Sequence, residues 1–329
     1  MKVLPVNTAH YANRLYNTKS YPFGTQVFCG KIKPDEFVKS KDVGLKDVQI
    51  VGKRFKDKIK IVFSDIDGTI SEKNDYVSYQ TASALDRLYS HNIPVILTTG
   101  RCYKDTIPIL EQFKHNPDYT IVLQGGSIID KNGKAIIENN ISKEGAQRLN
   151  NWFREEFSND KNSHLIIYFD DQTYCESNIQ FPWKARSLII PVKSFSEILD
   201  KGLDMQKAIL YKTDGYKSDF EKIVNSFRSC GIEDMEILQT GQKFYEFQNK
   251  NATKDKAIKY ILSELDINPK NAMAIGDSAN DIEMLDFINN EGGLAIAMGN
   301  ASKDVKNFAN AITSDINQDG YVKAIDSFL

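Results

Sequence analysis

The chain has few cysteines, and their spacing excludes two kinds of site. The four are Cys29, Cys102, Cys175 and Cys230, and no two of them form a Cys-x-x-Cys pair. Structural zinc sites and disulfide frameworks need closely or regularly spaced cysteines. We therefore expect free thiols, as in proteins of a reducing compartment.

Long hydrophobic runs are also missing. The sequence has no run of about 18 apolar residues, the length that a membrane-spanning helix needs. Residues 1–7 lack the apolar stretch of about 7–15 residues that marks a signal peptide. We expect no membrane association and a cytoplasmic location.

A surplus of basic residues is absent as well. The formal net charge is -2, and acidic and basic residues alternate along the chain without a charged tail. Because nucleic-acid-binding proteins usually carry a basic surplus or stripe, we expect no nucleic-acid partner. A hydrophobic content of 41% and a charged content of 26% are typical of a globular protein, and 329 residues suggest roughly two domains.

From Lys58 onward, short apolar runs alternate with amphipathic segments. Strands are predicted at residues 59–63, 93–97, 119–123, 272–275 and 294–298, and helices at residues 84–89 and 257–265. Alternating strands and helices are typical of a parallel sheet with right-handed crossovers. The predicted fold is α/β, with a doubly wound, Rossmann-like parallel sheet.

The pattern changes between the two halves of this sheet. Strand-like residues 165–169 and 208–211 alternate there with helix-like residues 144–157 and 218–230. We predict a core domain of residues 58–138 and 250–329, with an inserted α/β cap domain of residues 139–249. Residues 1–57 form an N-terminal extension to which the sequence assigns no role.

Polar residues collect where the predicted strands of the core domain end. They are Asp65 and Asp67, the run Thr99-Gly100-Arg101, then Asp277, Asn280 and Asp281, with Lys254 at the start of a helix. Ligands of open α/β sheets bind beyond the carboxyl ends of the strands. Clustered carboxylates need a compensating cation, and oxygen ligands suit Mg²⁺. Carboxylates, Mg²⁺ and an anion site together suggest phosphoryl transfer.

Four motifs in order then resemble those of one superfamily. Asp65-Ile66-Asp67-Gly68-Thr69 is similar to the first motif of the haloacid dehalogenase (HAD) superfamily, and Thr99-Gly100-Arg101 to the second. Lys254 matches the third motif, and residues 276–285 match the fourth, followed by the companion run 297–301. Their order resembles the Cof-type branch, whose sugar-phosphate phosphatases carry a type IIB cap between motifs two and three.

The resemblance implies a role for each motif residue. Asp65 would attack phosphorus and form an aspartyl-phosphate, while Asp67 would act as general acid and then as general base. Lys254 would keep Asp65 ionised. The implied phosphate ligands are Thr99, Gly100, Lys254 and Asn280. The implied Mg²⁺ ligands are Asp65, the Asp67 main-chain carbonyl, Asp277 and Asp281, the last through the waters of the metal.

Two departures from the family pattern leave the substrate open. Gln124-Gly125-Gly126 stands where many relatives have Asn-Gly, and Asp255 stands where many have Gly after the motif lysine. Candidate substrate contacts are Arg101, Gln124, Lys184 and Arg186. The loop at residues 181–186 fits an ordinary surface loop equally well, and Arg101 fits a bracing role equally well.

The predicted function is Mg²⁺-dependent hydrolysis of a small phosphorylated metabolite of the sugar-phosphate type. Two alternatives remain. A phosphomutase would share the aspartyl-phosphate and return the phosphoryl group to a sugar, and a non-catalytic phosphate-binding scaffold would use residues 1–57 as a partner-binding arm. The sequence leaves the oligomeric state open.

Overall fold

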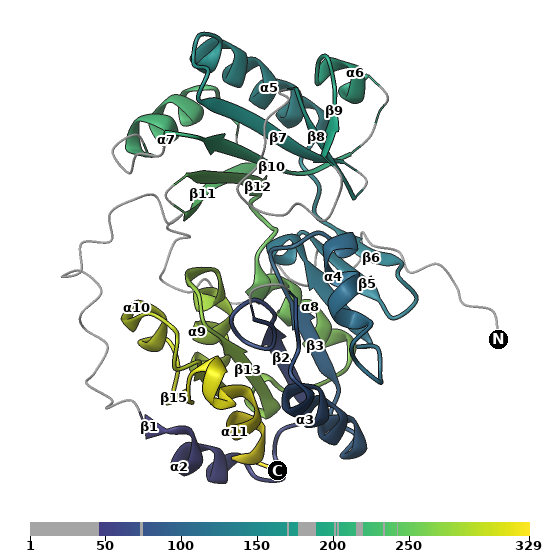
Figure 1. The fold of residues 1–329 in the computed structure, drawn as a ribbon, viewed down its shortest axis with the longest axis vertical. Coiled ribbons are helices and arrows are strands. Elements are labelled where there is room, and N and C mark those ends of the chain that lie inside the picture. The colour runs from purple at the N-terminus through teal and green to yellow at the C-terminus, as the bar shows by residue number, and fades with distance from the viewer. Residues whose placement is uncertain are drawn as a thin grey trace.

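The computed structural model contains two sheets, one above the other in Figure 1. It describes residues 46–72, 75–169, 171–176, 189–200, 202, 204–214, 220–232, 234–241 and 243–329. Most of the predicted N-terminal extension and the candidate substrate residues Lys184 and Arg186 lie outside these ranges. The structure therefore does not test the predictions made for these residues.

The larger sheet has nine strands in the order β1-β15-β14-β13-β2-β3-β4-β5-β6. Neighbours from β1 to β4 run parallel. The strands are β1 (Lys46–Asp47), β2 (Ile61–Asp65), β3 (Val95–Thr98), β4 (Tyr119–Val122), β5 (Ser127–Asp130), β6 (Ala135–Glu138), β13 (Ala272–Gly276), β14 (Leu294–Ala297) and β15 (Ala311–Ile312). All the strands predicted for the core domain are present.

Helices cover both faces of this sheet, because its central strands are apolar on both sides. The helices are α2 (Val48–Gly52), α3 (Tyr79–Ser90), α4 (Tyr103–Leu110), α8 (Lys254–Glu264), α9 (Ile282–Asn290), α10 (Lys303–Lys306) and α11 (Gly320–Asp326), with 3₁₀ turns η1 (Lys53–Phe55), η2 (Leu123–Gly125), η4 (Pro269–Asn271), η5 (Ala279–Asp281) and η6 (Ile316–Gln318). One hydrophobic core lies under α2, α3 and α11, and another lies under α8 and α9. The result is a three-layer α/β/α arrangement.

Two features of the nine-stranded sheet differ from the sequence prediction. The sheet begins before residue 58, because β1 pairs with β15 and the following α2 buries Val48 and Val51 in the core. The sheet is also not entirely parallel, since β5 and β6 run antiparallel to their neighbours. The strands that carry the motifs, β2, β3 and β13, still pair in parallel, as predicted.

The smaller sheet is formed by the inserted residues 139–249, called the inserted unit below. Its six strands have the order β11-β12-β10-β7-β8-β9. They are β7 (Ser163–Phe169), β8 (Gln172–Cys175), β9 (Ile189–Pro191), β10 (Met205–Lys212), β11 (Met235–Gly241) and β12 (Phe244–Asn249), accompanied by α5 (Lys143–Phe157), α6 (Ser196–Leu199) and α7 (Phe220–Ser229). In Figure 1, α5 and α7 cover the face of this sheet that is turned away from the nine-stranded sheet.

The inserted unit has its own hydrophobic core and still contacts the larger sheet. Trp152 of α5 packs there against Phe227 and Phe247, with ring centroids 5.5 and 5.4 Å away. On the opposite side, Tyr168 of β7 packs against buried residues that include Cys102 of the larger sheet region. One face of the smaller sheet therefore packs on its own helices, and the other face contacts the larger sheet region.

Across the described ranges, the helices are all too short or too polar to cross a membrane.

Candidate active site

Parallel pairing brings the motif residues to one edge of the nine-stranded sheet. Asp65 ends β2 and lies in register with Thr98, the last residue of β3. On the other side of β2, the adjacent β13 ends at Gly276, directly before Asp277. Because all three strands point the same way, their carboxyl ends deliver these side chains to a common space.

Lys254 links the predicted nucleophile, Asp65, to Asp281, which was predicted to support the metal. Its Nζ donates hydrogen bonds to Asp65 Oδ1 at 2.7 Å and to Asp281 Oδ1 at 2.6 Å. All three side chains are almost completely buried, with exposed fractions of 1%, 5% and 0% for Lys254, Asp65 and Asp281. Lys254 is the first residue of α8, as predicted, and this placement directs its side chain into the sheet edge. The site therefore contains a desolvated ion-pair network.

The other oxygen of Asp281 organises the turn that follows β13. Asp281 Oδ2 accepts hydrogen bonds from the backbone N–H groups of Asp277 and Ser278, both at 3.0 Å. The Ser278 side chain and Asp281 together form a capping box for η5. Asp281 is thus fixed by backbone on one side and by Lys254 on the other.

Asp277 has one satisfied oxygen and one orphaned oxygen. Its Oδ2 accepts a hydrogen bond from Asn300 Nδ2 at 3.0 Å, and the same amide group donates to the Gly68 carbonyl at 2.9 Å. Its Oδ1 is buried and has no partner among the described residues. A buried carboxylate oxygen without a partner costs free energy, so this oxygen is suited to bind a cation or an ordered water.

The charges at this edge fit a divalent cation. Carboxylate oxygens of Asp65, Asp277 and Asp281 lie within 4.8 Å of one another, and Lys254 supplies a single positive charge. Burial, followed by repulsion from Asp281, raises the pKa of Asp65 well above its usual value. The same two causes raise the pKa of Asp277 to about 6. Oxygen-only ligands with excess negative charge are the donor set that Mg²⁺ prefers.

The ammonium of Lys254 remains charged in this environment. Burial alone would lower its pKa, but the adjacent carboxylates of Asp281 and Asp65 outweigh that effect and raise the pKa above its usual value. A permanently charged ammonium suits the stabilisation of phosphoryl oxygens. Lys254 acts to lower the pKa of Asp65, but burial and Asp281 outweigh it, so the role that the resemblance implied for this lysine stays a prediction.

Asp67 lies beside the carboxylate cluster and points to a different partner. Arg101 donates to Asp67 Oδ2 through Nε at 2.7 Å and to Asp67 Oδ1 through Nη2. Arg101 Nη1 is held in turn by Asp75 Oδ1 at 2.8 Å and by the Asp105 carbonyl at 3.2 Å. The Asp67 side chain is 54% exposed, unlike that of Asp65. Its carboxylate is oriented and reachable, as a proton-transfer group must be.

The predicted phosphate ligands form a second group at the same edge. Thr99 is buried, and its hydroxyl accepts a hydrogen bond from the Arg101 N–H at 3.1 Å. Gln124 Oε1 accepts a hydrogen bond from Asn280 Nδ2 at 3.1 Å. A Cβ on Gly100 would lie 2.5 Å from Gln124 Nε2, so only glycine allows the amide to lie over this backbone. The Gln124 side chain therefore contacts both the backbone at Gly100 and the side chain of Asn280.

Two residues of the site received no role from the sequence. Asn300 follows β14, the neighbour of β13, so the rule that ligands gather at strand ends was a usable signal for it. Asp75 lies between the first motif and α3, at a position that no pattern marks. Its backbone is left-handed (φ 64°), which only the structure reveals.

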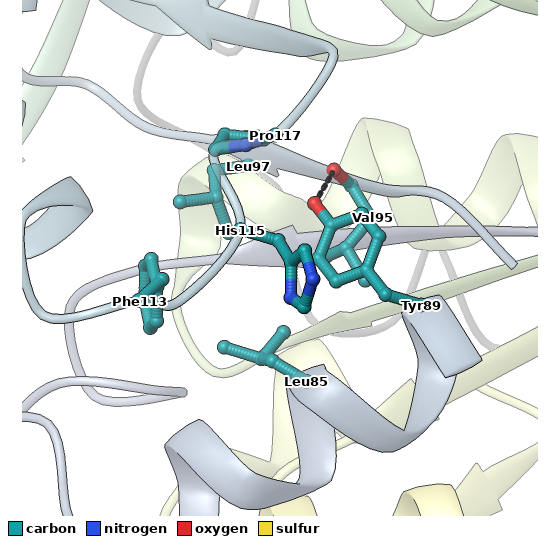
Figure 2. A pocket seen from close by; sticks show the side chains of 7 residues that line it. All are labelled: Leu85, Tyr89, Val95, Leu97, Phe113, His115 and Pro117. Atoms are coloured by element: carbon teal, nitrogen blue, oxygen red, sulfur yellow. Dashed lines mark hydrogen bonds between the residues drawn. The ribbon is translucent and has the colours of Figure 1, made fainter.

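A small cavity on the α3 side of the sheet is separate from this site. It has a volume of about 10 Å³ and is lined by apolar residues that include Leu85, Phe113 and Pro117 (Figure 2). Tyr89, which also lines it, donates a hydrogen bond to the Val95 carbonyl at 3.4 Å. A space of this size holds at most one water molecule. It does not compete with the sheet edge as a ligand site.

Comparison with known proteins places the chain in a family. The family of haloacid dehalogenase-like hydrolases matches residues 62–325. The chain therefore belongs to this family. Phosphatase YwpJ of Bacillus subtilis (strain 168) is 24% identical over 287 residues, which cover 78% of this chain and 94% of the relative. Phosphoglycolate phosphatase of Methanobrevibacter smithii is 24% identical over 273 residues, with coverage of 82% and 99%.

Solved structures show the same fold. The crystal structure of TM0651 from Thermotoga maritima superposes with a TM-score of 0.70 at 20% identity, covering 82% of this chain and 97% of that one. The HAD subclass IIB sugar phosphatase BT4131 gives a TM-score of 0.66 at 24% identity, with coverage of 82% and 98%. At these identities the likeness establishes the fold, and the predicted HAD-type architecture is confirmed.

Proposed function

We propose that this chain is a Mg²⁺-dependent phosphatase that hydrolyses a small phosphorylated metabolite of the sugar-phosphate type through an aspartyl-phosphate. The observation that carries the proposal is the position of Lys254 Nζ, within 2.7 Å of both Asp65 and Asp281, whose carboxylate oxygens lie within 4.8 Å of one another and of a carboxylate oxygen of Asp277. Relatives named as phosphatases support the reaction class, and a structural neighbour named as a sugar phosphatase supports the substrate class.

In the first step, an oxygen of Asp65 attacks phosphorus, and the bond between phosphorus and the leaving oxygen breaks. Asp67 transfers a proton to that oxygen, so the product leaves as an alcohol. In the second step, Asp67 takes a proton from water. The resulting nucleophile attacks phosphorus, inorganic phosphate departs, and Asp65 is regenerated as a carboxylate.

The remaining residues hold charge and position. Lys254 binds phosphoryl oxygens, and Thr99, the Gly100 N–H and Asn280 complete the phosphate site. Asp65, Asp277 and the Asp67 carbonyl would hold Mg²⁺, with Asp281 supporting it through water. The ion would neutralise the negative charge of the phosphoryl group and its nucleophile. The inserted unit, which we assign as a cap domain of residues 139–249, excludes bulk water from the reaction.

The nucleophile is tested by Asp65→Asn. We expect hydrolysis of p-nitrophenyl phosphate to fall by more than about 10³-fold, because the amide cannot attack phosphorus. Acid quench of the wild-type protein with ³²P-labelled substrate should trap a hydroxylamine-labile phosphoenzyme, absent from the variant. Asp86→Asn, on the exposed side of α3, is the control. Unchanged turnover by Asp65→Asn would remove this residue from the proposed role.

Two further measurements define the reaction. EDTA should abolish turnover, and added Mg²⁺ should restore it. Product analysis with a hexose 1-phosphate separates hydrolysis, which releases inorganic phosphate, from transfer to another hydroxyl of the sugar. Release of stoichiometric phosphate identifies a phosphatase, and accumulation of hexose 6-phosphate identifies a mutase.

A further inference from the structure

The turn that follows β4 has a strained backbone beside the catalytic edge. Leu123 and Gln124 have φ values of 53° and 59°, and Gly125 follows with φ 103°. Glycine adopts this left-handed region without a steric cost because it lacks a Cβ. Leu123 and Gln124 therefore pay a conformational cost that a glycine would not pay. Strained residues of this kind persist where the surrounding structure holds them, and they cluster at functional sites.

Hydrogen bonds join this turn to the segment of the second motif. The N–H of Leu123 donates to the Arg101 carbonyl at 2.8 Å. The N–H of Gln124 donates to the Thr99 carbonyl at 2.9 Å. Gly100 lies between these two acceptors in the sequence, and a Cβ there would lie 2.5 Å from Gln124 Nε2. The turn thus fixes the backbone that carries the Gly100 N–H, a proposed phosphate ligand.

The side chain of Gln124 contacts the fourth motif as well. It is only 7% exposed, and its Oε1 accepts a hydrogen bond from Asn280 Nδ2 at 3.1 Å. At the other end of the same amide, Asn280 Oδ1 accepts a hydrogen bond from the Ser278 hydroxyl. Both ends of the Asn280 amide are held, so the plane of the amide is fixed. Asn280 is partly exposed, and its nitrogen keeps a second N–H donor for a phosphoryl oxygen.

We propose that Gln124 is a positioning residue that orients the Asn280 amide toward the phosphoryl group. This inference rests on the proposed phosphatase function and deepens it. Gln124 acts through Asn280, and it does not contact the leaving group of the substrate. The left-handed backbone directs the Gln124 carboxamide to the space between Gly100 and Asn280, so the turn keeps a glutamine where a glycine would be less strained.

An uncharged carboxamide suits this role better than the alternatives. Its oxygen accepts from Asn280 without adding negative charge beside a phosphoryl group. A carboxylate at the same place would add to the surplus of negative side chains at the catalytic edge. An apolar side chain would leave the Asn280 nitrogen without its acceptor and the amide free to rotate.

The affinity for inorganic phosphate tests the inference without turnover. Isothermal titration calorimetry measures its dissociation constant for the full-length protein in Mg²⁺. Gln124→Met keeps the length of the side chain and loses the acceptor. We expect the dissociation constant to rise about tenfold, with a similar rise in KM for p-nitrophenyl phosphate. Asn280→Ala should raise the dissociation constant by at least as much, because it removes the donor itself. Wild-type affinity in either variant would overturn the inference.

The double variant of Gln124→Met and Asn280→Ala separates positioning from direct contact. If Gln124 acts through Asn280, the double variant should bind phosphate as weakly as Asn280→Ala alone, because no amide remains to be oriented. Effects that multiply would show that Gln124 binds phosphate itself, and they would also overturn the inference.

Gln124→Gly separates positioning from folding. Glycine relieves the left-handed backbone as it removes the side chain, so this variant should fold even where Gln124→Met does not. Its phosphate dissociation constant should still rise about tenfold, because Asn280 loses its acceptor. Wild-type affinity in Gln124→Gly would reject the positioning role.

Gln206→Met is the matched control. Gln206 is also 7% exposed, and its Oε1 accepts a hydrogen bond from the Asp171 N–H at 3.0 Å within the inserted unit. We expect this variant to bind phosphate as the wild type does. Equal losses of affinity in Gln206→Met and Gln124→Met would trace the effect to general destabilisation and overturn the inference.

The same measurements keep the inference apart from the proposed function. A wild type that binds phosphate but does not hydrolyse p-nitrophenyl phosphate rejects the proposed function, while the affinities of the variants still decide the role of Gln124. A wild type that hydrolyses p-nitrophenyl phosphate, with unchanged phosphate affinity in the Gln124 variants, rejects the positioning role alone.

Discussion

Arg101 binds both carboxylate oxygens of Asp67 while its third nitrogen binds Asp75. A bidentate guanidinium–carboxylate pair fixes the plane as well as the position of the carboxylate. Arg101 thereby orients Asp67, the proposed proton-transfer group. Arg101 is itself fixed by hydrogen bonds to Asp75 and to the Asp105 carbonyl. The sequence left Arg101 between substrate contact and brace, and these contacts lead us to propose a brace.

Arg101→Lys tests that bracing. A lysine keeps the positive charge but has no planar fork, so Asp67 loses its fixed orientation. We expect kcat to fall about 10- to 100-fold with little change in KM, since misplacement of a reacting group acts on the chemical step. Steady-state kinetics with p-nitrophenyl phosphate measures both constants. Arg87→Lys, in the exposed pair with Asp326, is the control and should keep wild-type kinetics. A selective rise in KM would instead make Arg101 a substrate contact.

Gly68→Ala should damage the metal site through direct contact. Gly68 has φ 84°, and a Cβ there would lie 2.3 Å from Asp277 Oδ2. Gly292→Ala is matched, because its φ is 82° and the described part of the chain places no heavy atom within 4 Å of the new Cβ. Both variants should lose about 1 kcal/mol of stability from the left-handed backbone. Only Gly68→Ala should also need more Mg²⁺ for half-maximal activity, and equal Mg²⁺ requirements would contradict the contact.

Asp65→Asn should stabilise the metal-free protein. The pKa of Asp65 is raised in the folded state by burial and by Asp281, so its charged form opposes folding at neutral pH. Removing that charge in EDTA at pH 7.5 should raise the free energy of unfolding by about 1 kcal/mol. Mg²⁺ should then raise the melting temperature of wild type more than that of the variant. Sodium chloride of equal ionic strength is the control, and equal Mg²⁺ responses would argue against a cation at Asp65.

The ion pair of Asp160 and Lys212 predicts a stability change at acid pH. Burial acts to raise the pKa of Asp160, but hydrogen bonds from Ser163, Lys212 and the Asn162 N–H outweigh it and lower the pKa from 3.8 to about 2. Its stabilisation is therefore present above about pH 4 and disappears as the pH falls toward about 2. Asp160→Asn should lower the free energy of unfolding at pH 7 by about 1–2 kcal/mol, allowing for a side chain that is 30% exposed.

Denaturant titrations from pH 7 to pH 2 measure this effect. The difference between wild type and Asp160→Asn should shrink as Asp160 becomes protonated. Glu155→Gln, an exposed carboxylate of α5, should show no such convergence. A difference that stays constant down to pH 2 would mean that the carboxylate contributes through shape alone.

The catalytic edge was predictable because parallel strands align their ends. Asp65, Asp277 and Lys254 are far apart in the sequence, yet each follows or precedes an element with a clear hydrophobic pattern. The structure places Lys254 Nζ 2.7 Å from Asp65 and carboxylate oxygens of Asp65 and Asp277 within 4.8 Å of each other, as the strand-end rule requires. The register of the strands sets the backbone positions of Asp65 and Asp277. Because aspartate side chains are short, these backbone positions determine which carboxylates lie close together.

Three features were not predicted, for different reasons. The antiparallel pair β5–β6 had a readable signal, since Asn132-Gly133 between two apolar runs favours a hairpin. The two-residue strand β1 is too short to leave a pattern. The choice of Asp67 as the partner of Arg101 depends on side-chain direction and on Asp75, and neither follows from spacing.

The separation of Asp65 and Lys254 by 189 positions has a consequence for biosynthesis. The ribosome completes the nucleophile's strand and the whole inserted unit before it adds the lysine that neutralises the nucleophile. Until then the emerging chain carries strands whose neighbour β13 does not yet exist. Long-range pairing of this kind slows folding, so the catalytic centre cannot assemble until Lys254 and Asp281 have both been synthesised.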